Sequence, residues 1–170
     1  VVTLQGENKE GLYLGNAGLP TVDATFSWTP EMVDELDRCR KSILQFANHF
    51  TIVSLDEGKI KISLRGYQKR ILKALAKNRL VAILSSRQSG KTTLMTIYAL
   101  WIICFKPDQR ILIIANKEKT AISIFSRIRL AYEKLPNYLK PGVATYGKTG
   151  MSLGNGSSIG ISTTSSDAAR

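Results

Sequence analysis

The sequence has 170 residues, of which 44% are hydrophobic, enough to fill one core. Lys and Arg outnumber Asp and Glu by 24 to 13, which gives a formal net charge of +11. No apolar run is long enough to span a bilayer, and the first residues lack the order of a signal peptide. We therefore expect a protein without a membrane partner.

The charge is unevenly distributed along the chain. Residues 1–57 contain 4 Lys/Arg and 9 Asp/Glu, whereas residues 58–170 contain 20 Lys/Arg and 4 Asp/Glu. No carboxylate lies between Glu57 and Asp108. Such a basic segment favours a polyanionic partner, either nucleotide phosphate or nucleic acid. A solvated basic surface, or an acidic complement on another domain, would give the same composition.

The first third of the chain divides into an arm and a helix with a hairpin. Residues 1–28 are rich in Gly, Asn, Thr and Pro and predict an extended or loosely ordered arm. Residues 29–64 predict a helix, with Thr29 as N-cap and Pro30 at its first position, followed by a hairpin that turns at 56–58. The buried stripe of the helix is predicted to be Val33, Leu36, Cys39, Ile43, Phe46 and Phe50.

Residues 65–170 predict a partial α/β core, in which helices alternate with short, continuously apolar strands. Such strands are typical of a parallel sheet covered by helices on both faces. The predicted helices are 65–78, 91–105 and 117–135, the strands are 79–85 and 110–116, and 143–163 suggests a hairpin.

The two cysteines and the single histidine show no pattern typical of a disulfide framework or a metal site. Cys39 and Cys104 are far apart at apolar helix positions, which predicts two buried free thiols in a reducing compartment. No carboxylates cluster at metal-ligand spacing, and His49 is predicted to be structural.

Residues 85–93 join a predicted strand to a predicted helix and contain Gly-Lys-Thr. In a phosphate-binding loop, backbone N–H groups and a lysine surround the phosphates, and a hydroxyl holds Mg²⁺ at the start of a helix. Gly90, Lys91 and Thr92 fit these roles, but Ser85 replaces the usual first glycine and its conformational freedom. The alternative is an ordinary strand-to-helix turn with a fortuitous lysine.

Three residues near this loop suit a bound nucleotide. Arg87, inside the loop, suits a γ-phosphate, with a solvent-facing arginine as the alternative. Gln68 carries an acceptor and a donor that match the N6 and N7 edge of adenine, and Tyr67 beside it can stack on the base. Taken alone, a glutamine at this position is most often a surface residue. A glutamine upstream of a Gly-Lys-Thr loop is the layout of helicase-like ATPases.

The loop SRQSGKTT, residues 86–93, closely resembles that of the large terminase subunit of tailed double-stranded DNA bacteriophages. That variant carries Arg-Gln before Gly-Lys-Thr-Thr and lacks the first glycine. The likeness to the packaging-ATPase half of this family runs from about Gly18 to Arg170. It implies a P-loop NTPase fold and an ATP-driven motor that translocates viral DNA. The other matching segments are WTPEMVDELDRCRKSILQFA, GKIKISLRGYQKRILK, LPNYLKPGV and NGSSIGISTTSSDAAR.

The resemblance also implies ATP and Mg²⁺ as cofactors and a role for each matching residue. Lys91 would contact the β- and γ-phosphates, Thr92 would ligate Mg²⁺ through its hydroxyl, and Arg87 would act on the γ-phosphate. Gln68, with Tyr67, would contact adenine. The rest of the loop would bind the phosphates: Ser86, Gln88, Ser89, Gly90 and Thr93.

The same resemblance implies binding partners and further domains of the intact protein. The expected partners are double-stranded DNA, a portal protein, a small terminase subunit and other copies in a ring, in the host cytoplasm. Arg170 matches an arginine that in some members is proposed to reach a neighbouring subunit's ATP. The family's second acidic motif, coupling motif and endonuclease domain do not occur in these 170 residues, so we expect little hydrolysis from them alone.

Two other functions are compatible with the residues. The first is a helicase-like translocase, which strand-separating activity and a second helicase core would favour. The second is a non-enzymatic module for DNA binding or assembly, which tight duplex binding without ATP binding would favour.

Overall fold

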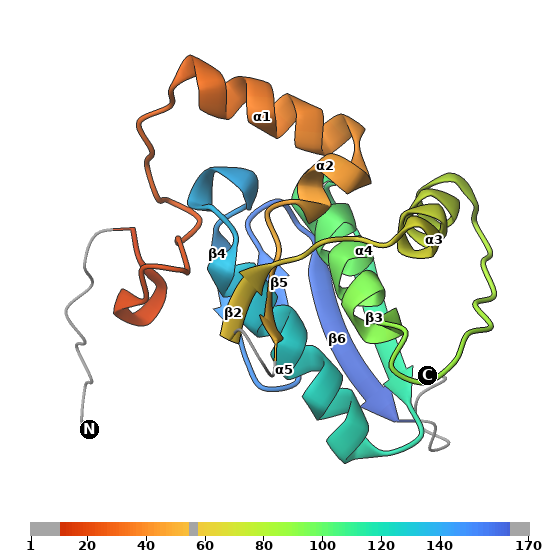
Figure 1. The fold of residues 1–170 in the computed structure, drawn as a ribbon. Helices are drawn as coiled ribbons and strands as arrows, with labels where there is room; N and C mark the ends of the chain where they lie inside the picture. Colours follow the sequence, from red (N-terminus) through yellow and green to blue (C-terminus); the bar gives the residue numbers. More distant parts are fainter. Residues whose placement is uncertain (1–10, 55–57, 164–170) are drawn as a thin grey trace, which may run out of the picture.

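The computed structural model describes residues 11–54 and 58–163 and has a mixed α/β fold (Figure 1). A four-stranded sheet has the order β3-β6-β5-β4, and β1 and β2 form a separate hairpin. The helices are α1 (Pro30–Lys41), α2 (Ile43–Ala47), α3 (Gly66–Lys77), α4 (Lys91–Phe105) and α5 (Glu118–Lys134), with 3-10 turns η1 (Tyr13–Gly15) and η2 (Asn137–Leu139). The strands are β1 (Thr51–Ser54), β2 (Gly58–Lys61), β3 (Arg110–Ala115), β4 (Val143–Tyr146), β5 (Gly150–Leu153) and β6 (Ser158–Thr163).

The sheet is mixed rather than parallel. β3 and β6 pair in parallel, from Arg110 opposite Ser158 to Ala115 opposite Thr163. β5 pairs antiparallel with both β6 and β4. The prediction of a parallel sheet is therefore correct only for β3 with β6, whereas the antiparallel strands β4, β5 and β6 lie in the segment for which a hairpin was predicted. Tight turns after β4 and β5 reverse the chain, which only antiparallel strands allow.

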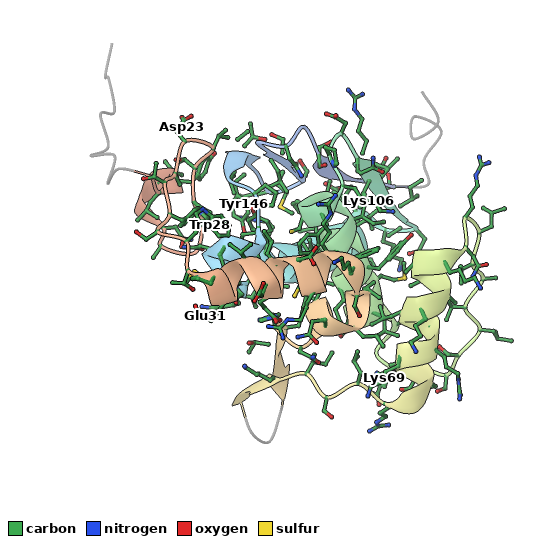
Figure 2. The ribbon with its side chains drawn as sticks, turned by 90° about the horizontal axis from the view of Figure 1, so that it is seen from above. Asp23, Trp28, Glu31, Lys69, Lys106 and Tyr146 are labelled. Carbon is green, nitrogen blue, oxygen red and sulfur yellow. The ribbon has the colours of Figure 1, made fainter. Side chains whose placement is uncertain are left out.

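Helices cover one face of this sheet. Figure 1 shows α4 and α5 on the near side of the strands and α1 across the top of the view, and in Figure 2, seen from above, α1 is nearest the viewer. Ile159 of β6 and Met151 of β5 point to the helices and are buried, whereas Leu112 and Ile114 of β3 are 53% and 51% exposed. The predicted covering of both faces is thus wrong for the described residues, because alternate side chains of β3 face away from the helices.

The predicted strand at 79–85 is also wrong. These residues form neither helix nor strand, and Leu80 and Leu84 are almost fully exposed. A strand requires a hydrogen-bonded neighbour, and none of the described strands pairs with this segment. It runs instead as part of a loop from the end of α3 to the start of α4 (Figure 1).

The predicted helix after Thr29 is divided into α1 and α2. The backbone at Ser42 is extended, with φ −136°, and its hydroxyl accepts a hydrogen bond from the backbone N–H of Gln45. Ser42 therefore ends one helix and caps the next. The predicted buried stripe is confirmed except at Val33, which is 50% exposed: Cys39, Ile43, Phe46 and Phe50 are buried, and Leu36 packs against the core. Thr29 caps α1 as predicted.

The remaining predicted elements are confirmed with small shifts at their ends. Helix α3 lies within 65–78, α4 begins at Lys91, and α5 lies within 117–135. Strand β3 and the β1–β2 hairpin are present, although the hairpin's turn lies outside the described residues. Cys39 and Cys104 are free thiols, the first fully buried and the second partly exposed. None of the described helices has the length and hydropathy needed to cross a membrane.

Helix α4 forms the centre of the core. It is apolar on nearly every side and packs against α2, α3 and α5, with the sheet behind it (Figure 1). The indole N–H of Trp101 donates to the backbone carbonyl of Cys39 at 2.9 Å and joins α4 to α1. Its fully buried side chains are Leu94, Ile97, Leu100 and Ile103.

A buried lysine connects the arm to the end of α5. Lys140 is 6% exposed, and its Nζ donates to the carbonyls of Gly18, Tyr132 and Glu133 at 2.7, 2.9 and 3.2 Å. The last two carbonyls lie in the final turn of α5, where a cation offsets the negative end of the helix dipole. Burial lowers the pKa of Lys140 to about 8.

We predict that Lys140→Met lowers the free energy of unfolding by about 2 kcal/mol at pH 7, because three buried carbonyls lose their donor. Because the folded-state pKa is lowered, the unfolded chain binds the extra proton between about pH 8 and 10.5, and the contribution of Lys140 to stability rises over that window. Urea unfolding of both proteins at pH 7 and pH 9.5 measures this difference. Lys134→Met, at an exposed position in α5, is the control. An equal deficit at both pH values would contradict the prediction.

Candidate functional site

The loop before α4 is curled by two left-handed residues. Gln88 has φ 59° and Gly90 has φ 81°, and Gly90 is the N-cap of the 15-residue helix α4. The motif usually has a glycine at the position of Ser85, and glycine is favoured where the backbone has a positive φ. Ser85 is not among the residues with positive φ, so a serine is tolerated there. The curl directs the loop around the N-terminus of α4, where unpaired N–H groups and the helix dipole favour an anion.

The ammonium of Lys91 lies inside this curl. Its Nζ donates to the carbonyls of Ser85 and Ser86 at 3.0 and 2.6 Å and contacts Ser89 Oγ at 3.5 Å. The hydroxyls of Ser85 and Ser89 are 2.9 Å apart and share a hydrogen bond, which closes the loop. A phosphate at this place would compete with two neutral carbonyls for the ammonium, and its charge would favour the phosphate.

Tyr67 and Gln68, in the first turn of α3, support the loop from the other side. Tyr67 Oη and Gln68 Nε2 both donate to the carbonyl of Ser89, at 3.0 and 3.3 Å. Gln68 Oε1 accepts from the backbone N–H of Arg65 at 2.9 Å. Both groups of the amide are therefore bonded within the protein. The structure brings the two residues to the loop, as predicted, and their contact with adenine stays a prediction.

A polar hollow of about 230 Å³ lies beside the loop. It is lined by the loop from Gln88 to Thr93 and by Arg127 of α5, so a lysine, an arginine and three hydroxyl-bearing side chains meet there. No carboxylate lines it within the described part of the chain. The hollow offers cations, N–H donors and hydroxyls, which are the groups that bind phosphate.

Arg127 is the residue that the sequence did not point to. It is exposed on α5, 36 positions after Lys91, and also lines a neighbouring hollow of about 380 Å³ with Thr93 and Thr96 of α4. Only the packing of α5 against α4 brings it to the loop. The sequence shows only that Arg127 lies on the polar side of an amphipathic helix. Every surface arginine on such a helix has this property, so it does not single out a binding residue.

A larger cavity of about 390 Å³ lies between α4, α5 and β3 but does not suit a triphosphate. Its lining is almost entirely apolar apart from Lys91, Thr92 and Thr96 at the α4 side. Anionic phosphates require donors and cations on several sides. The smaller polar hollow is therefore the better candidate site.

The other predicted residues are placed as follows. Thr92 and Thr93 line the polar hollow, so the hydroxyl predicted to bind Mg²⁺ lies at its edge. Ser86 faces Lys91 through its carbonyl. Arg87 is exposed and does not line the hollow. Arg170 lies outside the described residues.

No known protein-family model matches the chain. The functional conclusion consequently depends on the geometry of the loop and on the pattern of its sequence.

We predict that Gly90→Ala destabilises the protein by about 1–2 kcal/mol, the cost of a left-handed backbone for a residue with a Cβ. The new Cβ would also lie 2.7 Å from Gln68 Nε2 and displace that amide from the Ser89 carbonyl. Gly66→Ala is the matched control, because no atom lies within 4 Å of the position that its Cβ would take in the first turn of α3. This control should leave stability unchanged or slightly raised. Thermal unfolding compares the two, and equal melting temperatures would contradict the role of the turn.

Proposed function

We propose that this chain is the ATP-binding part of a viral DNA-packaging motor of the large terminase type, with a P-loop NTPase fold. Such a motor is an ATPase that couples hydrolysis to translocation of double-stranded DNA into a procapsid. The observation that carries the proposal is the loop from Ser85 to Lys91, curled at Gln88 and Gly90 around the lysine at the start of α4. The terminase-like sequence SRQSGKTT occupies this loop.

The residues of the polar hollow fit the phosphates of ATP. Lys91 and Arg127 supply two positive charges, and the N-terminus of α4 supplies backbone N–H groups. Catalysis of phosphoryl transfer rests mainly on positioning and on neutralising the charge of the γ-phosphate, and these groups can do both. ATP with Mg²⁺ supplies the phosphoryl group that is transferred to water.

The fit to Mg²⁺ is partial. The Thr92 hydroxyl is a suitable ligand at the edge of the hollow, but Mg²⁺ in such sites also requires a carboxylate nearby, directly or through water. None of the described residues that line the hollow supplies one. We therefore propose that these residues bind nucleotide, and that hydrolysis and the endonuclease activity of the intact protein need further acidic residues.

The adenine-binding role of Gln68 fits its place at the loop. Its amide and the Tyr67 hydroxyl share one acceptor, the Ser89 carbonyl, which directly precedes Gly90. A base that draws the Gln68 amide away would leave Tyr67 as the remaining donor to that carbonyl. Recognition of the base is thereby coupled to the conformation of the phosphate loop.

The proposed partners follow from charge and from the motor assignment. The excess of Lys and Arg in residues 58–170 suits the phosphate backbone of double-stranded DNA, bound without sequence preference and weakened by salt. In this proposal, several copies of the protein form a ring on a portal protein in the host cytoplasm. A small terminase subunit is a further partner.

We predict that Lys91→Ala raises the dissociation constant for Mg-ATP about 10- to 100-fold, because the phosphates lose a charge-assisted contact. Lys106→Ala, which removes a lysine just beyond the opposite end of α4, should leave the constant unchanged. Calorimetric titration with Mg-ATP measures both, and circular dichroism checks that both variants are folded. Absence of ATP binding by the parent chain, or equal affinity in Lys91→Ala, would refute the phosphate-binding role.

We further predict that Gln68→Ala reduces the preference for ATP over GTP about tenfold, whereas Tyr67→Phe weakens both nucleotides to the same extent. Both variants remove one donor to the Ser89 carbonyl, but only the first removes the predicted base-reading amide. Competition between the two nucleotides for each variant gives the ratio. If the two variants change the ratio equally, Gln68 supports the loop and does not read adenine.

A further inference from the structure

Three potential metal ligands meet between α1 and the end of α2. Glu35 and Cys39 are one turn apart on α1, and His49 follows α2. His49 Nε2 lies 2.7 Å from Glu35 Oε1, and Cys39 Sγ lies 3.5 Å from the same oxygen. All three donor atoms lie within 4.8 Å of one another.

These distances are close to those around a four-coordinate metal ion. Zinc binds nitrogen and oxygen at about 2.0–2.2 Å and sulfur at about 2.3 Å, so tetrahedral donors are about 3.3–3.7 Å apart. The Cys39–Glu35 distance already matches, and His49 has to withdraw from Glu35 by less than about 1 Å. Rotation of partly exposed side chains provides such a change, since Glu35 and His49 are 16% and 19% exposed.

The chemistry of the donors selects the ion. One thiol, one imidazole and one carboxylate are the ligands of Zn²⁺, whereas Mg²⁺ and Ca²⁺ take oxygen ligands alone. Helix α1 also carries Glu31 and Asp34, whereas its last turn holds Arg38, Arg40 and Lys41, so the selection of a cation rests on the ligands themselves.

Neighbouring side chains complete the site. Gln45 Nε2 lies 2.9 Å from Glu35 Oε1, so turning its amide over would direct the amide oxygen to the same centre as a fourth ligand. Arg38 pairs with the other oxygen, Oε2, at 3.0 Å and leaves Oε1 for the metal. Outer contacts of this kind orient a ligating carboxylate.

We propose that Glu35, Cys39 and His49 bind one Zn²⁺, which fixes α1 to the segment after α2. The ion takes the place of the hydrogen bonds that now converge on Glu35 Oε1, and the Cys39 thiol loses its proton on binding. The site is structural, and it lies in the acidic part of the chain, away from the phosphate loop in sequence. The inference stands independently of the proposed function.

Cobalt(II) in place of zinc tests the proposal on the whole chain. We expect one equivalent of Co²⁺ to give the strong visible bands of a tetrahedral ion and a thiolate-to-cobalt charge-transfer band, both removed by Zn²⁺. Cys39→Ser should abolish the charge-transfer band, and Cys104→Ser, the matched control, should keep it. His49→Gln should keep that band but weaken binding at least tenfold.

A second measurement covers the possibility that a variant is unstable. At one zinc concentration, the melting temperature should rise in the parent chain and in Cys104→Ser, and should rise less in His49→Gln, because that variant binds the ion more weakly. Circular dichroism checks that His49→Gln is folded. Absence of a thiolate band at one equivalent of Co²⁺, the same band in Cys39→Ser, or its loss in Cys104→Ser would overturn the site. Each of these results leaves ATP binding by Lys91 unaffected.

Discussion

The candidate site depends on the position of the N-terminus of α4, and this position is held because the helix is buried on nearly all sides. Four fully buried aliphatic side chains hold the helix between the sheet, α5 and the N-terminal helices: Leu94, Ile97, Leu100 and Ile103. Each of them contributes about 1.5–3 kcal/mol by leaving water. A helix held in this way cannot shift when its first turn binds a charged group, so the Lys91 ammonium and the backbone N–H groups keep their positions.

The carbonyl of Ser89 connects α3 to the loop through hydrogen bonds. It accepts from both Tyr67 and Gln68, and the next residue, Gly90, adopts the left-handed backbone that begins α4. A movement of α3 relative to α4 would therefore change these two hydrogen bonds. Leu72 and Leu75 of α3 are buried in the core, which holds the two helices together and makes that movement costly.

The sequence predicted the local features of this structure and missed those that depend on distant segments. Helices α3, α4 and α5, and the Thr29 cap, follow from apolar spacing and capping residues. The strand at 79–85 was wrong because its apolar run says nothing about whether a neighbouring strand exists. The break at Ser42 was missed because a serine inside an apolar stripe gives only a weak signal of its own.

The candidate sites divide in the same way. The loop and Gln68 could be found because their residues lie in one short stretch of sequence with a known pattern. Arg127 and the Glu35–Cys39–His49 cluster could not, because tertiary packing brings their members together. The spacing of His49 from Cys39 matches no common metal motif, so the sequence alone predicted a structural histidine.

The uneven charge of the chain explains why its two sites suit ligands of opposite sign. Among the side chains that the structure describes, every ion pair lies between Glu35 and His49, on α1 and the segment after it. The described cations of the basic part, Lys91 and Arg127 among them, consequently face no described carboxylate within salt-bridge distance. Their positive potential is left for an anion from outside, and the polar hollow is where two of them converge with a helix N-terminus. In the acidic part, one oxygen of Glu35 gathers three donors, which is the arrangement that a single cation can replace.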